Sequence, residues 1–354
     1  MEGFLLKRIY ITGILSALVV ISLHVKAQDP HFSQFSNTPL QINPALTGIF
    51  DGNFRMSNTY RSQWSSLGNG YKTLHVSLDA PVGKDKTEDH YFGVGLLVYQ
   101  DKAGTAGFKS TIIEGSLCYT TALDEGREHF FALGFQSGLN QNSIDLTKAT
   151  WDSQWNGDFF DPTLSSGESI QLPTFSYLDF NAGALYYYLP DENNYFNVGA
   201  SISHIGRPSV SFYTVTETPL RSKITVHSSG AFIIGNSYNA WIEPKVLVNV
   251  QGKQKEILAG GYFKNKVQLQ SHYTNYMKEA FFYGGVFYRY QDAVVLSARV
   301  EYNTWGLGIS YDVNTSTLSK LSASTNAFEI SLSYVSFMKR GNKSKNFNSI
   351  PRYF

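Results

Sequence analysis

Charged side chains that fall well inside otherwise alternating stretches are the residues of this sequence best suited to chemistry. They are Glu114, Asp179, Arg299, Glu301 and Glu329. In an enclosed interior such groups either pair with opposite charges or act as acids and bases. The sequence lacks H-E-x-x-H, a P-loop and G-x-S-x-G, and it offers no outward Ser, His and carboxylate set of the kind a barrel phospholipase needs. We therefore predict a protein that is not an enzyme, with no catalytic residue and no cofactor.

Metal binding has one candidate loop, which carries Asp152, Asn156, Asp158 and Asp161. Calcium takes several oxygen ligands, and one loop can supply them. The spacing does not match an EF-hand, so we favour a solvated loop and predict no metal site. The eight histidines are scattered, and the single cysteine, Cys118, excludes an intramolecular disulfide and a multi-cysteine zinc site.

The composition argues against nucleic acid as a partner. Lys+Arg number 29 and Asp+Glu number 28, so the chain lacks the excess of positive charge that phosphate backbones attract. The Gly-x-Gly pairs at 93–95 and 306–308 alternate along expected strands. We interpret them as strand glycines and not as a nucleotide-binding loop.

Residues 1–27 have the pattern of a cleaved secretory signal peptide. Lys7 and Arg8 form a basic start, Ile9–Leu23 is apolar, and Val25-Lys26-Ala27 places small residues before the expected cleavage site. An uncleaved membrane anchor is the alternative. After this segment the sequence has no apolar run of roughly 18 residues, so no membrane helix is expected.

The mature chain reads as a series of β-strands, most clearly over Phe281–Tyr334. Within Trp305–Asp312, for example, large apolar residues alternate with Gly306, Gly308, Ser310 and Asp312. Alternation with a period of two gives a strand one apolar face and one polar face. Because the connections within this stretch are very short, neighbouring strands must pair antiparallel.

The same pattern predicts about 14 strands. It leaves 264–279 ambiguous, as a strand extension, a separate strand or a loop. The expected strands are Asn53–Tyr60, Tyr71–Asp79, Tyr91–Asp101, Lys109–Ala122, His129–Ile144, Thr174–Tyr188, Tyr195–His204, Lys223–Ile234, Ala240–Gln251, Glu256–Phe263, Phe281–Tyr290, Ala293–Tyr302, Trp305–Asp312 and Ala327–Val335.

Two architectures fit such strands: a soluble sandwich with apolar faces inside, or an outer-membrane barrel with apolar faces towards lipid. The polar faces carry Gly, Ser, Asn and Gln more than Lys and Glu, as a confined lumen would. Aromatic clusters such as Tyr186-Tyr187-Tyr188 fall near strand ends, as interfacial girdles do. We predict an all-β, transmembrane antiparallel β-barrel over 51–337, with Cys118 facing the lumen.

Loop lengths give the barrel an orientation. The long connections Asp145–Pro173 and Ile205–Leu220 follow the fifth and seventh strands. In outer-membrane barrels the long loops are extracellular and the short turns periplasmic, so both termini are expected in the periplasm. Ala80–His90 is rather long for a periplasmic turn and Gln251–Lys255 short for an external loop, so the agreement is partial.

Two segments flank the expected barrel. Residues 28–50 contain Pro30, Pro39 and Pro44 among aromatic and amide residues, which keeps them out of a sheet. We expect this segment to act as a plug, packed in the lumen or at the periplasmic mouth. The basic residues of 338–354 form a tail that is either solvated or a docking peptide.

Arg55, Arg61 and Trp64 are placed where the first expected strand leaves the membrane. We interpret them first as a lumen ion pair with a girdle tryptophan. The second interpretation is a contact for a surface partner or for the amino-terminal segment.

The mature chain begins with Gln28-Asp29-Pro30-His31-Phe32-Ser33-Gln34-Phe35 and continues with Pro39-Leu40 and Asn43-Pro44-Ala45. Together with the later matches given below, these residues resemble a known family, PorP/SprF, over nearly the whole mature chain. The amino-terminal block is the most specific part. The ending is similar to the family's Cys-Pro-Arg-Phe, but Ile350 replaces the cysteine and Tyr353 is inserted. The matching residues are Gln28-Asp29-Pro30-His31-Phe32-Ser33-Gln34-Phe35, Pro39-Leu40, Asn43-Pro44-Ala45, Gly48, Arg55, Tyr60-Arg61-Ser62-Gln63-Trp64, Asp79-Ala80-Pro81, Gly93-Val94-Gly95, Asp101-Lys102-Ala103-Gly104, Gly134-Phe135-Gln136-Ser137-Gly138 and Pro351-Arg352-Tyr353-Phe354.

The resemblance implies an outer-membrane barrel of the type IX secretion and gliding machinery of Gram-negative bacteria. Its implied role is secretion or surface attachment of a partner, often a large adhesin with a type IX carboxy-terminal secretion domain, and its implied contacts include periplasmic ring proteins. A diffusion channel or hydrophobic-substrate transporter on the same fold is the alternative. The candidate contacts for a partner or for the plug are Phe32, Gln34, Phe35, Asn43, Pro44, Arg61, Trp64, Pro351, Arg352 and Phe354.

Overall fold

The computed structural model describes the barrel region and the segment before it. The described residues are 29–65, 70–84, 89–104, 106–167, 170, 172–191, 193–213, 218–235, 239–268, 278–315 and 326–336. The contacts divide the chain into residues 1–30 and 31–354, and the second unit is described by itself below. The predicted signal peptide, 1–27, and the predicted tail, 338–354, lie outside the described residues.

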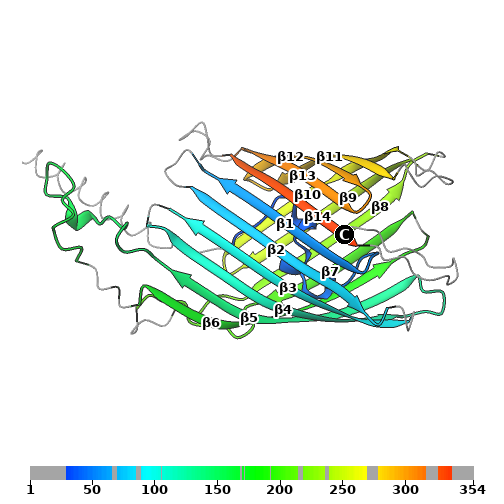
Figure 1. Cartoon of the computed structure of the whole chain (residues 1–354), viewed down its shortest axis with the longest axis horizontal. Helices are drawn as coiled ribbons and strands as arrows, with labels where there is room; N and C mark the ends of the chain where they lie inside the picture. Colours follow the sequence, from blue (N-terminus) through cyan, green and yellow to red (C-terminus); the bar gives the residue numbers. More distant parts are fainter. Residues whose placement is uncertain are drawn as a thin grey trace, which may run out of the picture. The chain divides into compact units, whose positions relative to one another are not determined.

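Within the described residues, fourteen strands form one closed antiparallel barrel, in which each strand pairs with its sequence neighbours and the first pairs with the last (Figure 1). The strand number therefore agrees with the prediction. The strands are β1 (Phe54–Gln63), β2 (Tyr71–Val82), β3 (His90–Ala103), β4 (Phe108–Ala122), β5 (His129–Ser143), β6 (Thr174–Tyr188), β7 (Tyr195–Ser203), β8 (Lys223–Ile233), β9 (Ala240–Gln251), β10 (Gln254–Gln268), β11 (Ala280–Arg289), β12 (Ala293–Tyr302), β13 (Trp305–Asn314) and β14 (Ala327–Ser336).

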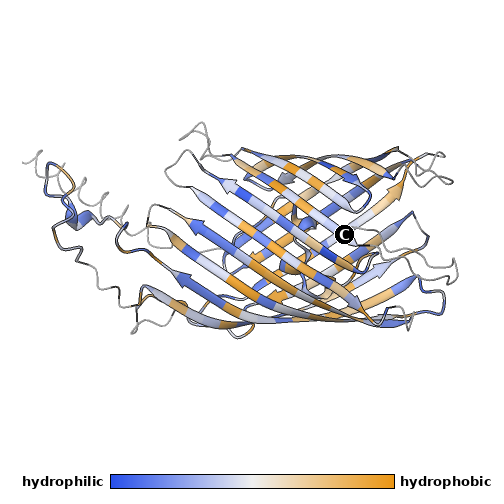
Figure 2. Ribbon diagram, viewed as in Figure 1, coloured by the Kyte–Doolittle hydropathy of each residue, from blue (hydrophilic) through white to orange (hydrophobic). Residues whose placement is uncertain are grey.

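Apolar side chains face outward and polar side chains face inward. On β2, Ser77 is 1% exposed and its neighbour Leu78 is 48% exposed, and on β4 Ser116 is 2% exposed and Leu117 is 59% exposed. Figure 2 shows the resulting alternation of hydrophilic and hydrophobic bands along the strands. A surface of this kind suits lipid and not water, so the structure favours the barrel over the soluble sandwich.

The two ends of the barrel differ in their connections. We call the end where β1 finishes and β2 begins the loop end, because it carries the long connections 144–173 and 204–222. The opposite end, where β1 begins at Phe54 and β14 finishes at Ser336, is the turn end. Among the described residues no helix is long and apolar enough to cross a membrane.

Several strand limits differ from those expected. β1 continues to Gln63, so Arg61 lies inside the strand and not beyond it. β10 continues to Gln268, so the ambiguous stretch begins as a strand extension, while residues 269–277 lie outside the described part. β9 and β10 are joined by two residues, and Gly252 adopts φ +63°, a left-handed conformation that suits glycine.

The interior of the barrel holds residues 31–50, which we call the plug (the dark blue segment within the strands in Figure 1). The plug contains three short helical turns: η1 (Phe35–Asn37), α2 (Pro39–Ile42) and η2 (Pro44–Leu46). Pro39 and Pro44 each open a turn, the position where a missing N–H costs no hydrogen bond. The prediction that prolines keep this segment out of the sheet is confirmed.

Candidate functional site

Apolar side chains of the plug pack directly on the barrel wall. Phe35, Ile42 and Leu46 belong to one buried cluster with wall residues such as Tyr187 and Phe287. The rings of Phe35 and Phe287 meet edge to face, with their centres 6.4 Å apart. Burial of large apolar groups against the wall stabilises a plugged state over an empty one.

At the other side of the plug, Phe32 and Leu40 form a second buried cluster with Leu97 and Tyr99. The ring of Phe32 lies edge-on to His75, with centres 5.9 Å apart, and to Tyr99, with centres 6.3 Å apart. The plug therefore contacts opposite sides of the barrel through aromatic rings.

Glycines of the wall leave the space that the plug backbone occupies. A β-carbon placed on Gly93 would lie 2.0 Å from the carbonyl oxygen of Thr47, and one on Gly134 would lie 2.2 Å from the nitrogen of Ala45. Non-bonded carbon atoms do not approach this closely, so any larger residue at these positions would displace the plug. Gly93 is one of the glycines that we interpreted as strand glycines, and the structure gives it a packing role.

Asn43 fixes the middle of the plug to three strands. Its amide nitrogen donates to the carbonyls of Ala184 (3.0 Å) and Ala200 (3.3 Å), and it lies 3.0 Å from Nε2 of His227. Its oxygen accepts a hydrogen bond from the N–H of Ala45 at 2.9 Å, which caps the η2 turn. The fully buried side chain of Asn43 thus caps the η2 turn and links it to β6, β7 and β8.

Near the loop end, five buried charged residues form what we call the ion cluster. Arg61 pairs with Glu329 and, at 3.1 Å, with Asp312. Arg289 pairs with the same Asp312 at 3.0 Å and with Glu256 at 3.2 Å. Since all five side chains are nearly inaccessible to solvent, each charge depends on its partners for stabilisation.

The plug completes the ion cluster with its backbone and one hydroxyl. The carboxylate of Glu329 accepts the N–H of Ser33 at 2.6 Å and that of Gln34 at 2.9 Å. The hydroxyl of Ser33 donates to Asp312 at 2.6 Å and accepts from Arg61 at 2.9 Å and from Arg289 at 2.6 Å. Hydrogen bonds to charged groups in an interior are among the strongest in proteins, so this end of the plug is firmly held.

A second ionic contact fixes the plug at the turn end. Arg55 binds Asp79 through two hydrogen bonds of 3.0 and 2.8 Å, and it also donates to the carbonyl of Leu46 at 3.2 Å. The second oxygen of Asp79 accepts the N–H of Gly48 at 2.8 Å. Arg55 therefore forms a lumen ion pair and contacts the amino-terminal segment. The expectation that it lies with Arg61 and Trp64 where the first strand leaves the membrane is wrong, because Arg55 is at the start of β1 and the other two are at its end.

These contacts also give the plug a direction. His31 lies 4.0 Å from Glu256, near the start of β10 at the loop end. At the other extreme, the carbonyl of Phe50 accepts a hydrogen bond of 2.9 Å from Lys84, in the connection that follows β2 at the turn end. The plug thus runs along the lumen from the loop end to the turn end before the chain enters β1.

The structure brings together most of the candidate contact residues. Phe32, Gln34, Phe35, Asn43 and Pro44 are buried parts of the plug, and Arg61 binds it from the wall. Trp64 follows β1 with φ +55°, and its ring lies edge-on to that of Tyr71, with centres 5.3 Å apart. Pro351, Arg352 and Phe354 lie outside the described residues.

Several residues of the site were not assigned their roles from the sequence. Glu329 was expected in the lumen, but its partners were not, and Arg289 and Glu256 were not considered. The available signal was a charge on the polar face of a strand near the loop end. A charged residue on the lumen face needs a partner of opposite charge, but its position in the sequence does not show which residue that partner is.

Cys118 and the candidate calcium loop make hydrogen bonds within the protein. The thiol of Cys118 faces the lumen, as predicted, and donates to the carbonyl of Ala45 at 3.3 Å. In the candidate calcium loop, oxygens of Asn156 and Asp161 accept hydrogen bonds from Asp158 and Thr163. Across the part of the chain that the structure describes, no group of three His, Cys, Asp or Glu residues is arranged to hold a metal ion.

Comparison with known families identifies the family to which the chain belongs. The model of the family described as type IX secretion system membrane protein PorP/SprF matches residues 24–334. The chain belongs to the PorP/SprF family. The match covers the plug and almost the whole barrel, so the family resemblance noted from the sequence is confirmed. Together with the outward apolar faces, it makes this PorP/SprF protein a β-barrel of the outer membrane.

The solved structures that match this PorP/SprF protein have low sequence identity to it. The CymD monoaromatic hydrocarbon channel has 12% identity and a TM-score of 0.49, with 86% of this chain and 93% of that chain covered. The P. putida toluene transporter TodX has 11% identity and a TM-score of 0.47, with 84% and 93% covered. No curated protein matches the chain.

Proposed function

We propose that the protein is a non-enzymatic outer-membrane component of the type IX secretion machinery that supports secretion or surface attachment of a specific partner protein. Membership of the family supports the association with the machinery. The observation that carries the proposal is the plug, which lies in the lumen and is fixed to the wall at both ends. A barrel closed in this way serves better as a docking platform than as a pore.

The length of its connections supports the loop end as the outer face. Extracellular loops are generally the longer ones, and 144–173 and 204–222 are both at this end. We propose that the partner is a secreted, adhesin-like protein with a type IX carboxy-terminal secretion domain. The basic tail at 338–354, with Pro351, Arg352 and Phe354, would then meet periplasmic ring proteins, and Trp64 would lie at the outer rim.

Deletion of the gene in the source bacterium tests the proposal. Surface proteins released from intact cells by protease are identified by mass spectrometry, and total secreted protein is measured in parallel. We expect one or a few proteins with type IX secretion domains to leave the surface while general secretion continues. Unchanged display of every such protein would show the proposal to be wrong.

The diffusion channel is the alternative that the same fold permits. The close contact of the plug backbone with the wall glycines Gly93 and Gly134 disfavours it, because a solute would have to pass a segment that packs directly on the wall. Purified protein in planar lipid bilayers separates the two functions. We expect no stable conductance from the intact chain, whereas steady open channels would favour the alternative.

A further inference from the structure

The connection between β5 and β6 exposes three large aromatic rings. Trp155 is 57% exposed, Phe159 is 59% exposed and Phe160 is 39% exposed. They belong to the connection 144–173 at the loop end, outside the wall formed by the strands. Exposed apolar groups gathered in one place usually mark an interaction site.

The backbone holds these rings in a fixed turn. Trp155 and Phe160 form a β-bridge, and the N–H of Asn156 donates to the carbonyl of Phe159 at 3.2 Å. The side-chain oxygen of Asn156 accepts the N–H groups of Asp158 and Phe159, both at 3.0 Å. We call 155–160 the aromatic turn. Because its conformation is already set, a partner that binds it loses little freedom of the loop.

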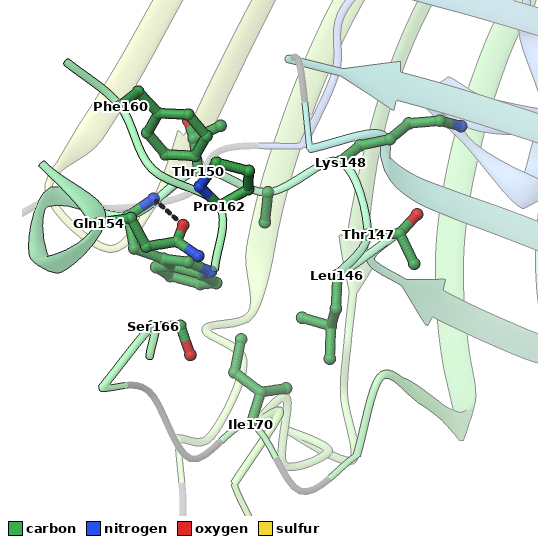
Figure 3. A pocket seen from close by; sticks show the side chains of 11 residues that line it. Leu146, Thr147, Lys148, Thr150, Gln154, Phe160, Pro162, Ser166 and Ile170 are labelled. Carbon is green, nitrogen blue, oxygen red and sulfur yellow. Dashed lines mark hydrogen bonds between the residues drawn. The ribbon is translucent and has the colours of Figure 1, made fainter. Parts of the chain in front are cut away.

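A pocket adjoins the aromatic turn. Its volume is about 410 Å³, and Phe160 contributes to its wall together with Leu146, Trp151 and Ile170 (Figure 3). Polar groups of Thr150 and Ser166 also line it. This size lies within the range of pockets that take up ligands or several side chains of a partner.

The connection is strongly acidic. It carries five acidic residues against a single basic one, Lys148, which is paired with Asp145 at 2.9 Å. Hydrogen bonds from Thr147 and Lys148 lower the pKa of Asp145 to about 2, and those from Thr163 lower the pKa of Asp161. Around the aromatic turn the carboxylates of Asp152 and Asp158 are exposed. A complementary surface must therefore carry positive charge.

We propose that the aromatic turn and its adjoining pocket form the docking site for a basic segment of the partner protein. A side chain of that segment enters the pocket, which both polar and apolar residues line, and Lys or Arg side chains face Asp152 and Asp158. An anionic lipid surface would be repelled by the same carboxylates, which is why we assign the site to protein. The inference rests on the proposed function, because it names the surface with which this barrel holds its partner.

The test uses the full-length protein in the source bacterium, with the proteins displaced by gene deletion as the readout. Trp155→Ala combined with Phe159→Ala should lower their surface amount about tenfold or more, since aromatic anchors dominate interfaces of this kind. Asp152→Lys with Asp158→Lys should have a similar effect through charge repulsion. Leu164→Ala, at a residue 39% exposed in the same connection, is the matched control and should leave display unchanged.

A photo-crosslinking amino acid at position 155 identifies the occupant directly. A crosslink to a displaced protein, at a segment rich in Lys or Arg, supports the inference. A crosslink to another copy of this chain, or to lipopolysaccharide alone, overturns it. If deletion displaces proteins but the turn variants do not, the docking inference is wrong and the proposed function stands. If deletion displaces none, the proposed function is wrong, and the crosslink alone decides whether this surface binds protein.

Discussion

The side-chain oxygen of Asn43 occupies the position next to Gly183 that a β-carbon would need, at a distance of only 1.9 Å. Gly183 belongs to β6 and Asn43 to the plug, and 140 positions of sequence separate them. The wall of the barrel and the segment inside it are therefore complementary in shape. A barrel that opened and closed freely around a mobile segment would not require glycine at such a contact.

Replacement of this glycine should loosen the plug. We expect Gly183→Ala to reduce the free energy of unfolding by about 1–3 kcal/mol, since overpacking forces the plug or the wall to move. Urea unfolding of the purified barrel in detergent measures the change. Gly115→Ala is the control, because a β-carbon there meets no atom closer than 4.0 Å. Equal effects of the two variants would contradict the fit between wall and plug.

The contact of Glu329 with the plug should dominate stability at the loop end. Glu329→Ala removes one of the two carboxylates that pair with Arg61 and leaves the N–H groups of Ser33 and Gln34 without their acceptor, in a site that solvent does not reach. We expect a loss of about 3–5 kcal/mol, the usual result of breaking a buried ion pair. Denaturant unfolding and single-channel recording, which should now detect openings, check the result.

A solvent-accessible ion pair provides the matched control for Glu329. Glu279 pairs with Lys266 at 2.9 Å, and the two side chains are 25% and 19% exposed. Glu279→Ala should cost less than about 1 kcal/mol, as pairs in contact with water usually do. A cost for Glu329→Ala as small as this would mean that the ion cluster does not hold the plug.

The ion pair at the turn end should show strong coupling in a double-mutant cycle. Arg55→Met and Asp79→Leu each remove a partner that also binds the plug backbone, at Leu46 and at Gly48. We expect a coupling free energy above about 1 kcal/mol from equilibrium unfolding. The exposed pair of Arg127 and Asp89, 3.0 Å apart, should give only about 0.2–1 kcal/mol. Coupling of equal size in the two pairs would rule out a special role for the buried one.

The direction of the plug predicts where the mature chain begins. If the predicted signal peptide is removed after residue 27, three residues precede His31, and they span at most about 11 Å. The amino terminus should therefore lie near the loop end. We expect Asp29→Cys, in a chain with Cys118→Ser, to react with a membrane-impermeant maleimide on intact cells.

Two further cysteines calibrate this labelling. Ser153→Cys, in the long connection at the loop end, should react on intact cells. Asn239→Cys, in the turn between β8 and β9, should react only after the outer membrane is opened. If Asp29→Cys behaved like Asn239→Cys, the amino terminus would be periplasmic, as we expected from the sequence. The inference from the short distance between His31 and the amino terminus would then be wrong.

The sequence by itself determined the strands and their faces. Alternation is a local property with a period of two, so residues such as Ser77 and Leu78 reveal their opposite surroundings without knowledge of the rest of the chain. The prolines at 39 and 44 likewise excluded the plug from the sheet, because a proline has no N–H to donate to a neighbouring strand wherever it stands in the chain.

Only the tertiary structure decided which inward residues meet. Arg61 and Glu329 are 268 positions apart, and they become neighbours because β1 pairs with β14 when the barrel closes. The fit of Gly183 to Asn43 likewise depends on how the plug lies in the lumen, as does the course of the plug from His31 to Phe50. Contacts across a lumen follow from strand register and closure, and no local period in the sequence encodes them.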